Sequence, residues 1–590
     1  MPAALAPTSA PAPAPAPAPV PVEAPGWGLG RADLASDPPD PELLADAPPP
    51  HVWLVHRVLP WRMLAGQVVW VTDRAWGLEG TCRALGLERE AALFVEAETR
   101  AMDAALARRF GPRIARDAAD ALPAGESVRG LARLRARLAA GLAALAALWL
   151  PAAALLTPLA FLLLIVMNAL TAGMRLAALT AGWWRDAAEV EGHGPAPCAL
   201  ADEPVEAPPA GPAGAALPRI SLIVPLFREA GMVGPLSEAL GRIDYPDDRL
   251  EVKLVVEADD APTRRALEAA VLPPAWSVLV VPPGRPRTKP RALNYALAFC
   301  QGSIVGVLDA EDRPNPQQLR IVAAAFAGLP ARYGCVQCRL AFHNARENWV
   351  SRCFQIEYAI WFDVLLAGWE RLGLPVPLGG TSVYFRRAAL AYCGGWDAHN
   401  VTEDADLGMR LFRRGWRTRL VESTTEEEAN FRVVPWMRQR SRWLKGFLLT
   451  WLSHVRAPGR LWREMGPLGW LGFHVLFLGA AVSYLAMPLF WLSLAVSAAT
   501  GGSLWAHWMP ESLLWAAACS LIVGQAVMVS CALRAVWRKR ALDLALWVPL
   551  MPVYWTLGAI AAWKAVGELF VAPTYWDKTR HGVSRLARRG

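Results

Sequence analysis

The chain has 590 residues, too many for one compact core, so we expect several domains or a soluble domain combined with a membrane portion. Hydrophobic residues make up 54% of the chain and charged residues only 19%, which argues against an ordinary soluble protein. The formal net charge is +8, and much of it flanks apolar runs, at RGLARLRARL (129–138), RAVWRKR (534–540) and TRHGVSRLARRG (579–590). Such placement is typical of cytoplasmic membrane anchors, and no DNA- or RNA-binding motif accompanies it, so we expect a lipid bilayer and no nucleic acid as partner.

The N-terminal part divides into two regions. Residues 1–50 are dominated by Pro and Ala, which cannot build a core, and we predict a disordered tail. Residues 51–130 predict a small α/β domain with a strand at AGQVVWVTD (65–73) and a short strand followed by an amphipathic helix at 89–111. Over about 70 residues this pattern resembles the N-terminal domain of type II secretion ATPases, although the chain has no GxxxxGK[ST] phosphate loop. The resemblance implies a secretion or regulatory partner for residues 51–130.

An uncharged run of 37 residues follows, from Leu138 to Met174. Its length suffices for two minimal spans of about 18 residues each, with a turn expected at Thr157-Pro158. We therefore predict a transmembrane hairpin over 136–184, which would leave the basic residues at its two ends on one side of the membrane. Residues 185–217, rich in Pro and Ala, are expected to form a linker.

Residues 218–446 have the composition of a soluble domain. Four buried strands are predicted, at PRISLIVPLFRE (218–229), EVKLVVEADD (251–260), WSVLVVPP (276–283) and GSIVGVLDAED (302–312). Amphipathic helices fall between them, for example at 235–244 and 289–300. This alternation indicates a parallel, doubly wound sheet whose ligand site lies at the carboxyl ends of the strands.

The C-terminal region, 447–590, returns to the membrane. Residues 447–464 predict an amphipathic interfacial helix, 467–500 one crossing broken at Pro488 or two crossings, and 513–533 a clear span. Residues 544–563 predict a span or a re-entrant hairpin kinked by Pro549 and Pro552. If both 534–540 and the basic tail are cytoplasmic, residues 544–571 cross an even number of times, and we favour a hairpin.

Crowded carboxylates end the fourth predicted strand, in VLDAEDRP (307–314). Asp309 and Glu311 lie two residues apart and point the same way, so they could share a divalent cation whose other ligands are diphosphate oxygens. Taken alone, a D-x-E pair is about three times more often a solvated acidic loop. Asp312 is expected to brace this loop or to cap a helix.

Four further motifs accompany this pair. TKPRALNYAL (288–297) begins a helix that leaves Lys289 free to face an anion, and GGTSVYFRR (379–387) places a Gly-Gly turn between apolar segments. NVTEDADLGMRLFRRG (400–415) sets Thr402, Glu403 and Asp404 at a helix start, where an ordinary N-cap would explain Thr402 but not the consecutive acids. MRQRSRWLKG (437–446) has the pattern Q-x-x-R-W, and a basic membrane anchor is an equally good interpretation of that motif alone.

Together and in this order, these motifs resemble the processive membrane glycosyltransferases of family 2, the cellulose-synthase superfamily. The resemblance covers residues 218–446 closely and the flanking membrane segments loosely. It is nearest to bacterial cellulose-synthase-like transferases with VPLFRE, EADD, DAEDRP, NARENW, GGTS and TEDADLG stretches and a closing segment like 552–582. It implies a GT-A-type (Rossmann-like) glycosyltransferase domain inserted between transmembrane helices.

The resemblance also implies roles for individual residues. Asp404 would be the catalytic base, and Asp309 and Glu311 would hold a divalent cation, Mg²⁺ or Mn²⁺. The acid that contacts the nucleotide base could be Glu257, Asp259 or Asp260. The residues implied to bind the nucleotide sugar are Glu229, Glu257, Asp259, Lys289, Asp309, Gln439 and Arg442. Those implied at the acceptor are Gly380, Thr381, Thr402, Glu403 and Trp443.

Chemistry from the residues agrees with this assignment. A diphosphate that leaves with two negative charges needs a cation and basic groups such as Lys289 and Arg442. An acceptor hydroxyl that attacks needs a carboxylate to take its proton, and Asp404 is the best candidate. No covalent nucleophile is evident, which suggests single displacement with inversion. Trp443 suits a carbohydrate, whose C–H faces pack on aromatic rings.

The sequence thus predicts a multi-pass enzyme of the bacterial inner membrane with a cytoplasmic catalytic domain. It would polymerise a β-glucan-like exopolysaccharide from a UDP-sugar, with UDP-glucose as the expected donor, and translocate the chain. One alternative is transfer of a single sugar to a lipid-linked or oligosaccharide acceptor. Another is a non-catalytic membrane scaffold.

Overall fold

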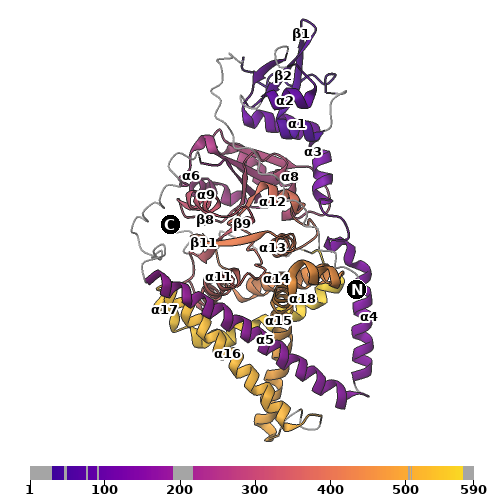
Figure 1. The fold of residues 1–590 in the computed structure, drawn as a ribbon, viewed down its shortest axis with the longest axis vertical. Coiled ribbons are helices and arrows are strands. Elements are labelled where there is room, and N and C mark those ends of the chain that lie inside the picture. Colours follow the sequence, from indigo (N-terminus) through magenta and orange to yellow (C-terminus); the bar gives the residue numbers. More distant parts are fainter. Residues whose placement is uncertain are drawn as a thin grey trace, which may run out of the picture. The chain divides into compact units, whose positions relative to one another are not determined.

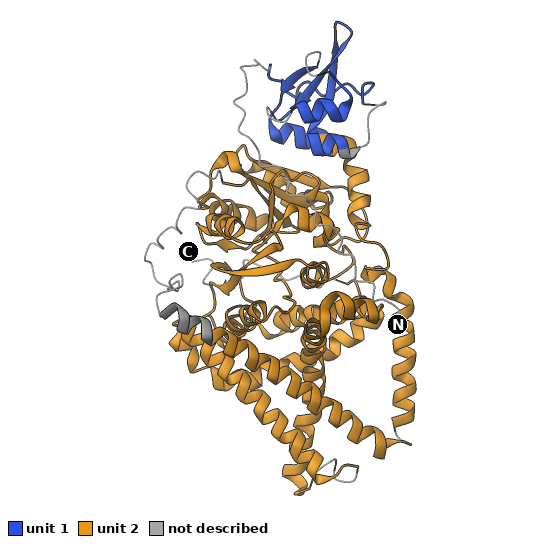
Figure 2. Cartoon of the chain, viewed as in Figure 1, with its two compact units in different colours: residues 1–105 blue, residues 106–590 orange. Residues whose placement is uncertain are grey.

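The computed structural model describes residues 30–44, 50–74, 78–88, 92–149, 151–190, 217–502, 505 and 508–575. The chain separates into two compact units, residues 1–105 and 106–590 (Figure 2). The predictions for most of the Pro/Ala tail, for linker residues 191–216 and for the basic tail beyond Tyr575 fall outside the described residues.

The first unit is a small α/β domain, as predicted. In the described residues its sheet has the order β1 (Val58–Leu64), β2 (Gln67–Thr72), β3 (Leu93–Glu96), with β1–β2 antiparallel and β2–β3 parallel. Helices α1 (Pro50–His56), α2 (Leu78–Leu85) and the start of α3 (Thr99–Ala119) complete it. Strand β1 was not predicted, because a register shift between Pro60 and Arg62 breaks its alternation.

Residues 30–44 also belong to this unit, so the prediction of a disordered tail is wrong for them. Arg31 pairs with Glu96 of β3, and Leu34 is only 2% exposed. A buried leucine supplies the apolar contact that the preceding Pro/Ala repeats lack.

The predicted domain boundary at residue 130 is also wrong, because the second unit begins inside α3. The amide of Asn294 donates to the carbonyl of Ala118 at 3.1 Å. The hydroxyl of Ser127 and the N–H of Val128 both donate to the carboxylate of Asp397 at 2.8 Å. The segment after residue 105 therefore packs on the region of the large sheet.

Two helices precede the large sheet: α4 (Ala132–Trp149) and α5 (Ala153–Val190), with the 3-10 turn η1 (Val128–Leu131) before them. The chain turns at Pro151-Ala152, and Pro158 lies inside α5, so the predicted turn at Thr157-Pro158 is displaced. Pro151 ends the first helix because its ring disfavours helical geometry in the residue before it.

In the described residues the large sheet has the order β6-β5-β4-β7-β10-β9-β11-β8 (Figure 1). Its strands are β4 (Ile220–Leu226), β5 (Leu250–Glu257), β6 (Trp276–Val281), β7 (Ile304–Val307), β8 (Arg313–Pro314), β9 (Tyr333–Phe342), β10 (Val383–Arg386) and β11 (Arg417–Glu427). The four predicted strands, β4 to β7, are parallel. Strand β10 runs antiparallel to β7 and β9, so the sheet is mixed rather than wholly parallel.

Helices cover both faces of this sheet and continue into the apolar region. They are η2 (Ala230–Met232), α6 (Val233–Gly241), η3 (Asp247–Arg249), α7 (Ala261–Ala269), α8 (Lys289–Leu297), α9 (Gln318–Gly328), α10 (Trp349–Ala359), α11 (Leu366–Arg371), α12 (Arg387–Tyr392), α13 (Glu403–Arg413) and α14 (Val433–His454). Residues Ile360–Leu365, between α10 and α11, form a π-helix. This is the GT-A-type, Rossmann-like fold that the sequence predicts, with a mixed sheet.

The strand order of the sheet reverses at β4. Strands β5 and β6 follow β4 on one side, whereas β7 lies on its other side. In open α/β sheets a crevice opens at such a point, beyond the carboxyl ends of the strands. The loops there carry Glu229 after β4 and Asp309 after β7.

The C-terminal helices are α15 (Pro458–Thr500), α16 (Glu511–Arg538), α17 (Leu542–Ala545), the turn η5 (Val548–Leu550) and α18 (Met551–Val571). In the described part of the chain, four helical stretches are long and apolar enough to cross a membrane: Ala153–Gly182, Pro458–Thr500, Glu511–Arg538 and Leu542–Val571. The predicted interfacial helix over 447–464 is instead divided between α14 and α15. Residues 467–500 form one helix that continues through Pro488.

The hairpin favoured for residues 544–571 is wrong, because α18 is a single helix. Pro549 and Pro552 stand at the starts of η5 and α18, where a missing N–H leaves no helical hydrogen bond unmade. Both ends of the α17–α18 segment contact the domain that contains the large sheet. Asp543 pairs with Arg346 at 2.8 Å, and Glu568 pairs with Lys445 of α14 at 2.8 Å.

Helices α14 and α18 lie side by side below the sheet (Figure 1). The indole N–H of Trp436 donates to the hydroxyl of Tyr554 at 2.8 Å, and both side chains are fully buried. The large-sheet domain and the apolar helices therefore share one hydrophobic core.

Candidate functional site

A cavity of about 420 Å³ opens at the carboxyl ends of β4, β5 and β7 and extends between α5, α15, α16 and α18. Of the predicted site residues, all but Asp259 line it. They come from separate elements: the loops after β4 and β7, the end of β5, and the starts of α8 and α13. The Gly-Gly turn before β10 and the middle of α14 supply the rest.

At the sheet end of the cavity, one acid of VVEADD faces inward. Glu257 ends β5, and its carboxylate lies 3.5 Å from the guanidinium of the buried Arg291. Burial raises the pKa of Glu257 to about 7, although Arg291 and Arg287 oppose the shift. Asp259 lies outside the lining and pairs with Arg287 at 2.8 Å, while Asp260 is buried and caps the start of α7. Of the three candidates for the acid at the nucleotide base, the cavity thus contains only Glu257.

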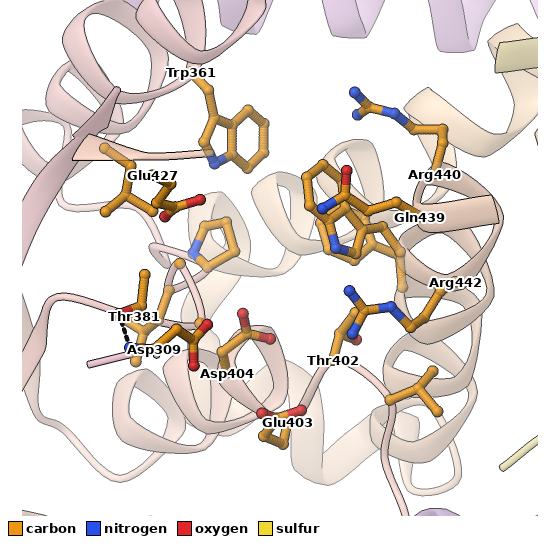
Figure 3. Close-up of a pocket in the computed structure, with 18 of the residues that line it drawn as sticks. Asp309, Trp361, Thr381, Thr402, Glu403, Asp404, Glu427, Gln439, Arg440 and Arg442 are labelled. Carbon is orange, nitrogen blue, oxygen red and sulfur yellow. Dashed lines mark hydrogen bonds between the residues drawn. The ribbon is translucent and has the colours of Figure 1, made fainter. Parts of the chain in front are cut away.

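The DAED turn is held by hydrogen bonds from its own backbone. The N–H of Asp309 donates to Asp312 at 2.8 Å and to the hydroxyl of Thr381 at 3.1 Å. That hydroxyl in turn donates to Asp312. Thr381 thus braces the turn, as the buried Asp312 does, and the Asp309 side chain is left facing the cavity (Figure 3).

Several carboxylates crowd this turn. Burial raises the pKa of Glu311 well above its usual value, and the charges of Asp309 and Glu229 raise it further. The pKa of Glu427, at the end of β11, is also raised by burial and by the acids of the DAED turn. A local excess of negative charge of this kind favours a bound cation.

The donor set fits a divalent cation shared with a ligand. No group of three or more His, Cys, Asp or Glu side chains in the described residues is arranged to ligate one ion. Asp309 and Glu311 nevertheless line one cavity, and Mg²⁺ is commonly held by one or two carboxylates with phosphate oxygens and water completing the octahedron.

The predicted base lies in the first turn of α13. Asp404 accepts a hydrogen bond from the N–H of Ala405 at 2.8 Å. Burial raises its pKa, while Lys289 and Arg442 lower it. Burial and the charge of Asp404 raise the pKa of the adjacent Glu403 to about 7. In Figure 3 the Asp404 carboxylate lies between Asp309 and Arg442.

The N-cap interpretation of Thr402 is wrong, because its side chain makes no capping hydrogen bond. Instead Thr402 packs against α14 at Gly446, where an added Cβ would lie only 2.3 Å from its hydroxyl oxygen. The side-chain amide of Asn400 also donates to the hydroxyl of Thr450 at 2.9 Å. These contacts hold the start of α13 against the helix that carries the Q-x-x-R-W motif.

The Q-x-x-R-W face of α14 lines the cavity. Arg442 is partly buried, and desolvation lowers its pKa against the attraction of Glu403, Asp404 and Asp309. Gln439 accepts a hydrogen bond from Asn430 at 3.0 Å, and Trp443 packs near Tyr358. The interpretation as a surface membrane anchor does not fit this position.

Gly380 leaves room for the base. A Cβ at this position would lie 3.0 Å from the Oδ2 atom of Asp404 and 3.7 Å from the Nζ atom of Lys289. The backbone of the Gly-Gly turn therefore approaches the base more closely than a larger residue would allow.

Sequence reasoning missed several lining residues. Glu427 ends β11 in TTEEEAN and Glu428 follows it, and the sequence signal of these two residues is the same as that of DAED, consecutive acids at a strand end. Glu357 of α10 and Trp361 of the π-helix also line the cavity. Glu357 pairs there with Arg440 and accepts a hydrogen bond from Tyr554 at 2.7 Å.

The apolar end of the cavity was also not predicted. It includes Arg175 of α5, Tyr484 of α15 and Gln525 of α16. The one signal in the sequence was Arg175 itself, a charge near the end of a long apolar segment. The π-helix contributes Ile360, Trp361, Phe362 and Leu365 to the wall between this end and the base.

Comparison with known proteins shows what the domain is similar to. Residues 304–560 match the family model described as glycosyl transferase family group 2. The β-monoglucosyldiacylglycerol synthase of Synechocystis sp. is 32% identical over 279 residues, which are 45% of this chain and 55% of that protein. The cellulose synthase 1 catalytic subunit of Komagataeibacter xylinus is 24% identical over 240 residues, 39% of this chain and 31% of that protein. The chain therefore spans about half, or less, of the length of these relatives.

Among solved structures, a mannosyltransferase from Pyrobaculum calidifontis in complex with GDP-Man and Mn²⁺ is 21% identical with a TM-score of 0.42. The alignment covers 69% of this chain and 98% of that one. The family match includes β7 and the DAED turn, the TED and Q-x-x-R-W motifs and the first half of α18. Residues 304–560 are thus similar to the family 2 glycosyltransferases.

Proposed function

We propose that the protein is a membrane-bound, inverting glycosyltransferase that moves a hexose from a nucleotide sugar to an acceptor entering from the membrane side. One observation carries this proposal: Asp404, the DAED turn and Lys289 line a single cavity. The DAED turn and Lys289 line its end toward the sheet, and apolar helices line its other end. The site thus has room for a donor on one side of the base and an acceptor on the other.

The donor end is proposed to bind a UDP-sugar. Glu257 would accept hydrogen bonds from the nucleotide base, and Glu229 lies nearby after β4. Lys289 and Arg442 would offset the negative charge that builds on the diphosphate as the bond to the sugar breaks. Asp309 and Glu311 would hold the divalent cation, which supplies further compensation of that charge when bound.

Asp404 is proposed to accept the proton of the attacking acceptor hydroxyl. Burial raises its pKa, which makes its carboxylate a stronger base than an exposed aspartate. One base with no covalent nucleophile gives a single displacement at the anomeric carbon, so the configuration inverts.

For the acceptor, elongation of a β-linked exopolysaccharide remains the first candidate. Aromatic side chains line the acceptor end, among them Trp361, Trp443 and Trp555, and sugar faces pack on such rings. Relatives named cellulose synthase and glucomannan 4-β-mannosyltransferase are consistent with this candidate.

Single transfer to a membrane lipid is the second candidate. It is favoured by the apolar wall formed by residues such as Leu365, Met487 and Met528, and by the relative named β-monoglucosyldiacylglycerol synthase. Both candidates imply a multi-pass protein of the bacterial inner membrane with a cytoplasmic catalytic domain, because nucleotide sugars are cytoplasmic. A non-catalytic scaffold would have no need for the base and its cavity.

The test is incubation of the purified protein in nanodiscs with a panel of radiolabelled nucleotide sugars. A long product with uniform linkages would support elongation, and a chloroform-soluble product carrying one sugar would support lipid transfer. Asp404→Asn serves as the negative control. If no nucleotide sugar yields a product and UDP does not bind, the proposal is wrong and the scaffold stands.

A further inference from the structure

The membrane-side end of the cavity contains a cation with no acidic partner. Arg175 lies on α5, within the candidate span Ala153–Gly182, and lines the same cavity as Asp404. The groups whose charges act on it are Tyr484 and Cys531, both neutral at pH 7. No carboxylate of the described residues is among these groups.

A second polar group in this end is also unsatisfied. The Oε1 atom of Gln525, on α16, is buried and accepts no hydrogen bond in the described structure. Tyr484 of α15 lines the same cavity and lies close enough to Arg175 for their charges to interact. Three polar side chains from three apolar helices thus line one cavity.

Their surroundings are apolar. Ala480, Met487 and Met528 line the same end of the cavity, and α5, α15 and α16 are each apolar enough to cross a membrane. A guanidinium among apolar side chains is costly unless an anion pairs with it, and ionisable residues in membrane helices generally serve a ligand path. Neutral hydroxyls of a sugar would leave that charge uncompensated.

We propose that Arg175, Tyr484 and Gln525 form a subsite for the phosphate group of a lipid whose acyl or prenyl chain lies against Met487 and Met528. The guanidinium would pair with the phosphate oxygens, and the side-chain amide of Gln525 would donate a hydrogen bond to the ligand. The inference rests on the proposed function, since it gives the acceptor end of that site a ligand class. The phosphate belongs either to a lipid-linked acceptor or to a membrane phospholipid that lines the acceptor path.

Lipid binding can be measured without any nucleotide sugar. The protein in maltoside detergent is titrated with dioleoylphosphatidylglycerol, with polyprenyl phosphate and with dioleoylglycerol, and bound lipid is counted by native mass spectrometry. We expect the two phosphate lipids to bind and dioleoylglycerol to bind at least 10-fold more weakly. Arg175→Gln should weaken the binding of both phosphate lipids about 10-fold or more, and Arg175→Lys should restore part of that affinity.

Arg463→Gln is the matched control, because Arg463 is an exposed arginine of α15 outside the cavity. Thermal unfolding of each variant shows whether it is folded, and Arg175→Lys keeps the charge if Arg175→Gln does not fold. Equal binding of phosphate lipid to the wild type and a folded Arg175→Gln would overturn the subsite. So would equal affinity for dioleoylglycerol, or preference for an acidic oligosaccharide.

Transfer assays then separate the two sources of the phosphate. If labelled sugar is found on polyprenyl phosphate, the phosphate belongs to the acceptor. If phosphatidylglycerol receives no sugar but changes the KM for the acceptor, the phosphate belongs to a phospholipid that lines the acceptor path. If the wild type binds phosphate lipids but transfers no sugar, the proposed function fails while the subsite stands. If transfer proceeds and Arg175→Gln changes neither KM nor lipid binding, the subsite fails alone.

Discussion

The Nζ atom of Lys289 joins the two halves of the site: it pairs with the Asp309 carboxylate at 2.5 Å and donates to the carbonyl of Gly380 at 2.8 Å. Lys289 begins α8, Asp309 follows β7, and Gly380 lies in the turn beside Asp404. The ammonium group of Lys289 therefore connects Asp309, which we propose binds the diphosphate and its cation, to the turn beside Asp404. The predictions below follow from this arrangement.

Asp404→Asn should abolish transfer while leaving binding of UDP nearly unchanged. The amide keeps the shape of the side chain but cannot accept the acceptor's proton, and loss of a general base typically costs about 10²–10⁴-fold in rate. Transfer is measured with the labelled donor, and UDP affinity by calorimetry. Unchanged turnover in this variant would rule out Asp404 as the base.

Chelation should stop transfer, and added Mg²⁺ or Mn²⁺ should restore it. Asp309→Asn and Glu311→Gln should each raise the concentration of cation needed for half-maximal activity, because each removes a charged ligand. Glu238→Gln, on an exposed face of α6, is a suitable control. Activity insensitive to EDTA would remove the proposed metal role of both residues.

On the acid side of the pH profile, kcat should fall with an apparent pKa above the ordinary aspartate value of about 4. Burial raises the pKa of Asp404, and the base works only when ionised, so activity is lost as pH falls through that raised value. Lys289 lowers the pKa of Asp404, so Lys289→Gln should move this apparent pKa to a still higher value. The profile is measured at saturating donor. An apparent pKa that stays in place or moves to a lower value would contradict the assignment.

Gly446→Ala should destabilise the protein and slow transfer. The new methyl group would lie 2.3 Å from the Thr402 hydroxyl, and overpacking of this kind costs about 1–3 kcal/mol. Because Thr402 precedes the base on α13, relief of the clash should displace Asp404. Thermal unfolding and kcat are compared with Gly459→Ala, where an added Cβ meets nothing within 4 Å. Equal effects of the two substitutions would count against this coupling.

Both ends of the α17–α18 segment should lie on one side of the membrane. Asp543 and Glu568 pair with Arg346 and Lys445 of the catalytic domain, so a crossing in between is not expected. In a Cys519→Ser background, cysteines at Leu542 and Val571 should react with an impermeant maleimide from the cytoplasmic side, and a cysteine at Gly502 from the other. Opposite labelling of Leu542→Cys and Val571→Cys would show that α18 crosses.

Much of the catalytic domain could be predicted from local patterns. Strands β4 to β7 are buried on both faces, so their apolar runs stand out from the flanking helices. The acids at their carboxyl ends follow from the topology, which is why Asp309 and Glu257 were found. Strand β10 is only four residues long and its pairing with β7 is set by tertiary contacts, so the antiparallel part was missed.

The membrane half was less predictable because hydropathy does not report contacts. The sequence of α18 is as apolar as that of a membrane-crossing helix. In the structure, however, its Lys564 and Glu568 pair with each other and one of its faces packs on α14. Likewise, Arg175 is one charge in an apolar run. Only the structure shows that it shares a cavity with residues more than 200 positions away, such as Asp404.

The π-helix at Ile360–Leu365 gives this cavity a wall whose phase depends on a single residue. A π-turn accommodates one residue more than an α-turn, so deleting one residue there would return the segment to α-helix while the flanking helices keep their phase. The side chains of the segment itself, such as Phe362 and Leu365, would then be rearranged while α10 and α11 kept their lengths. A change of one residue in this segment would thus reshape the wall of the cavity without altering the residues of the DAED turn or of α13.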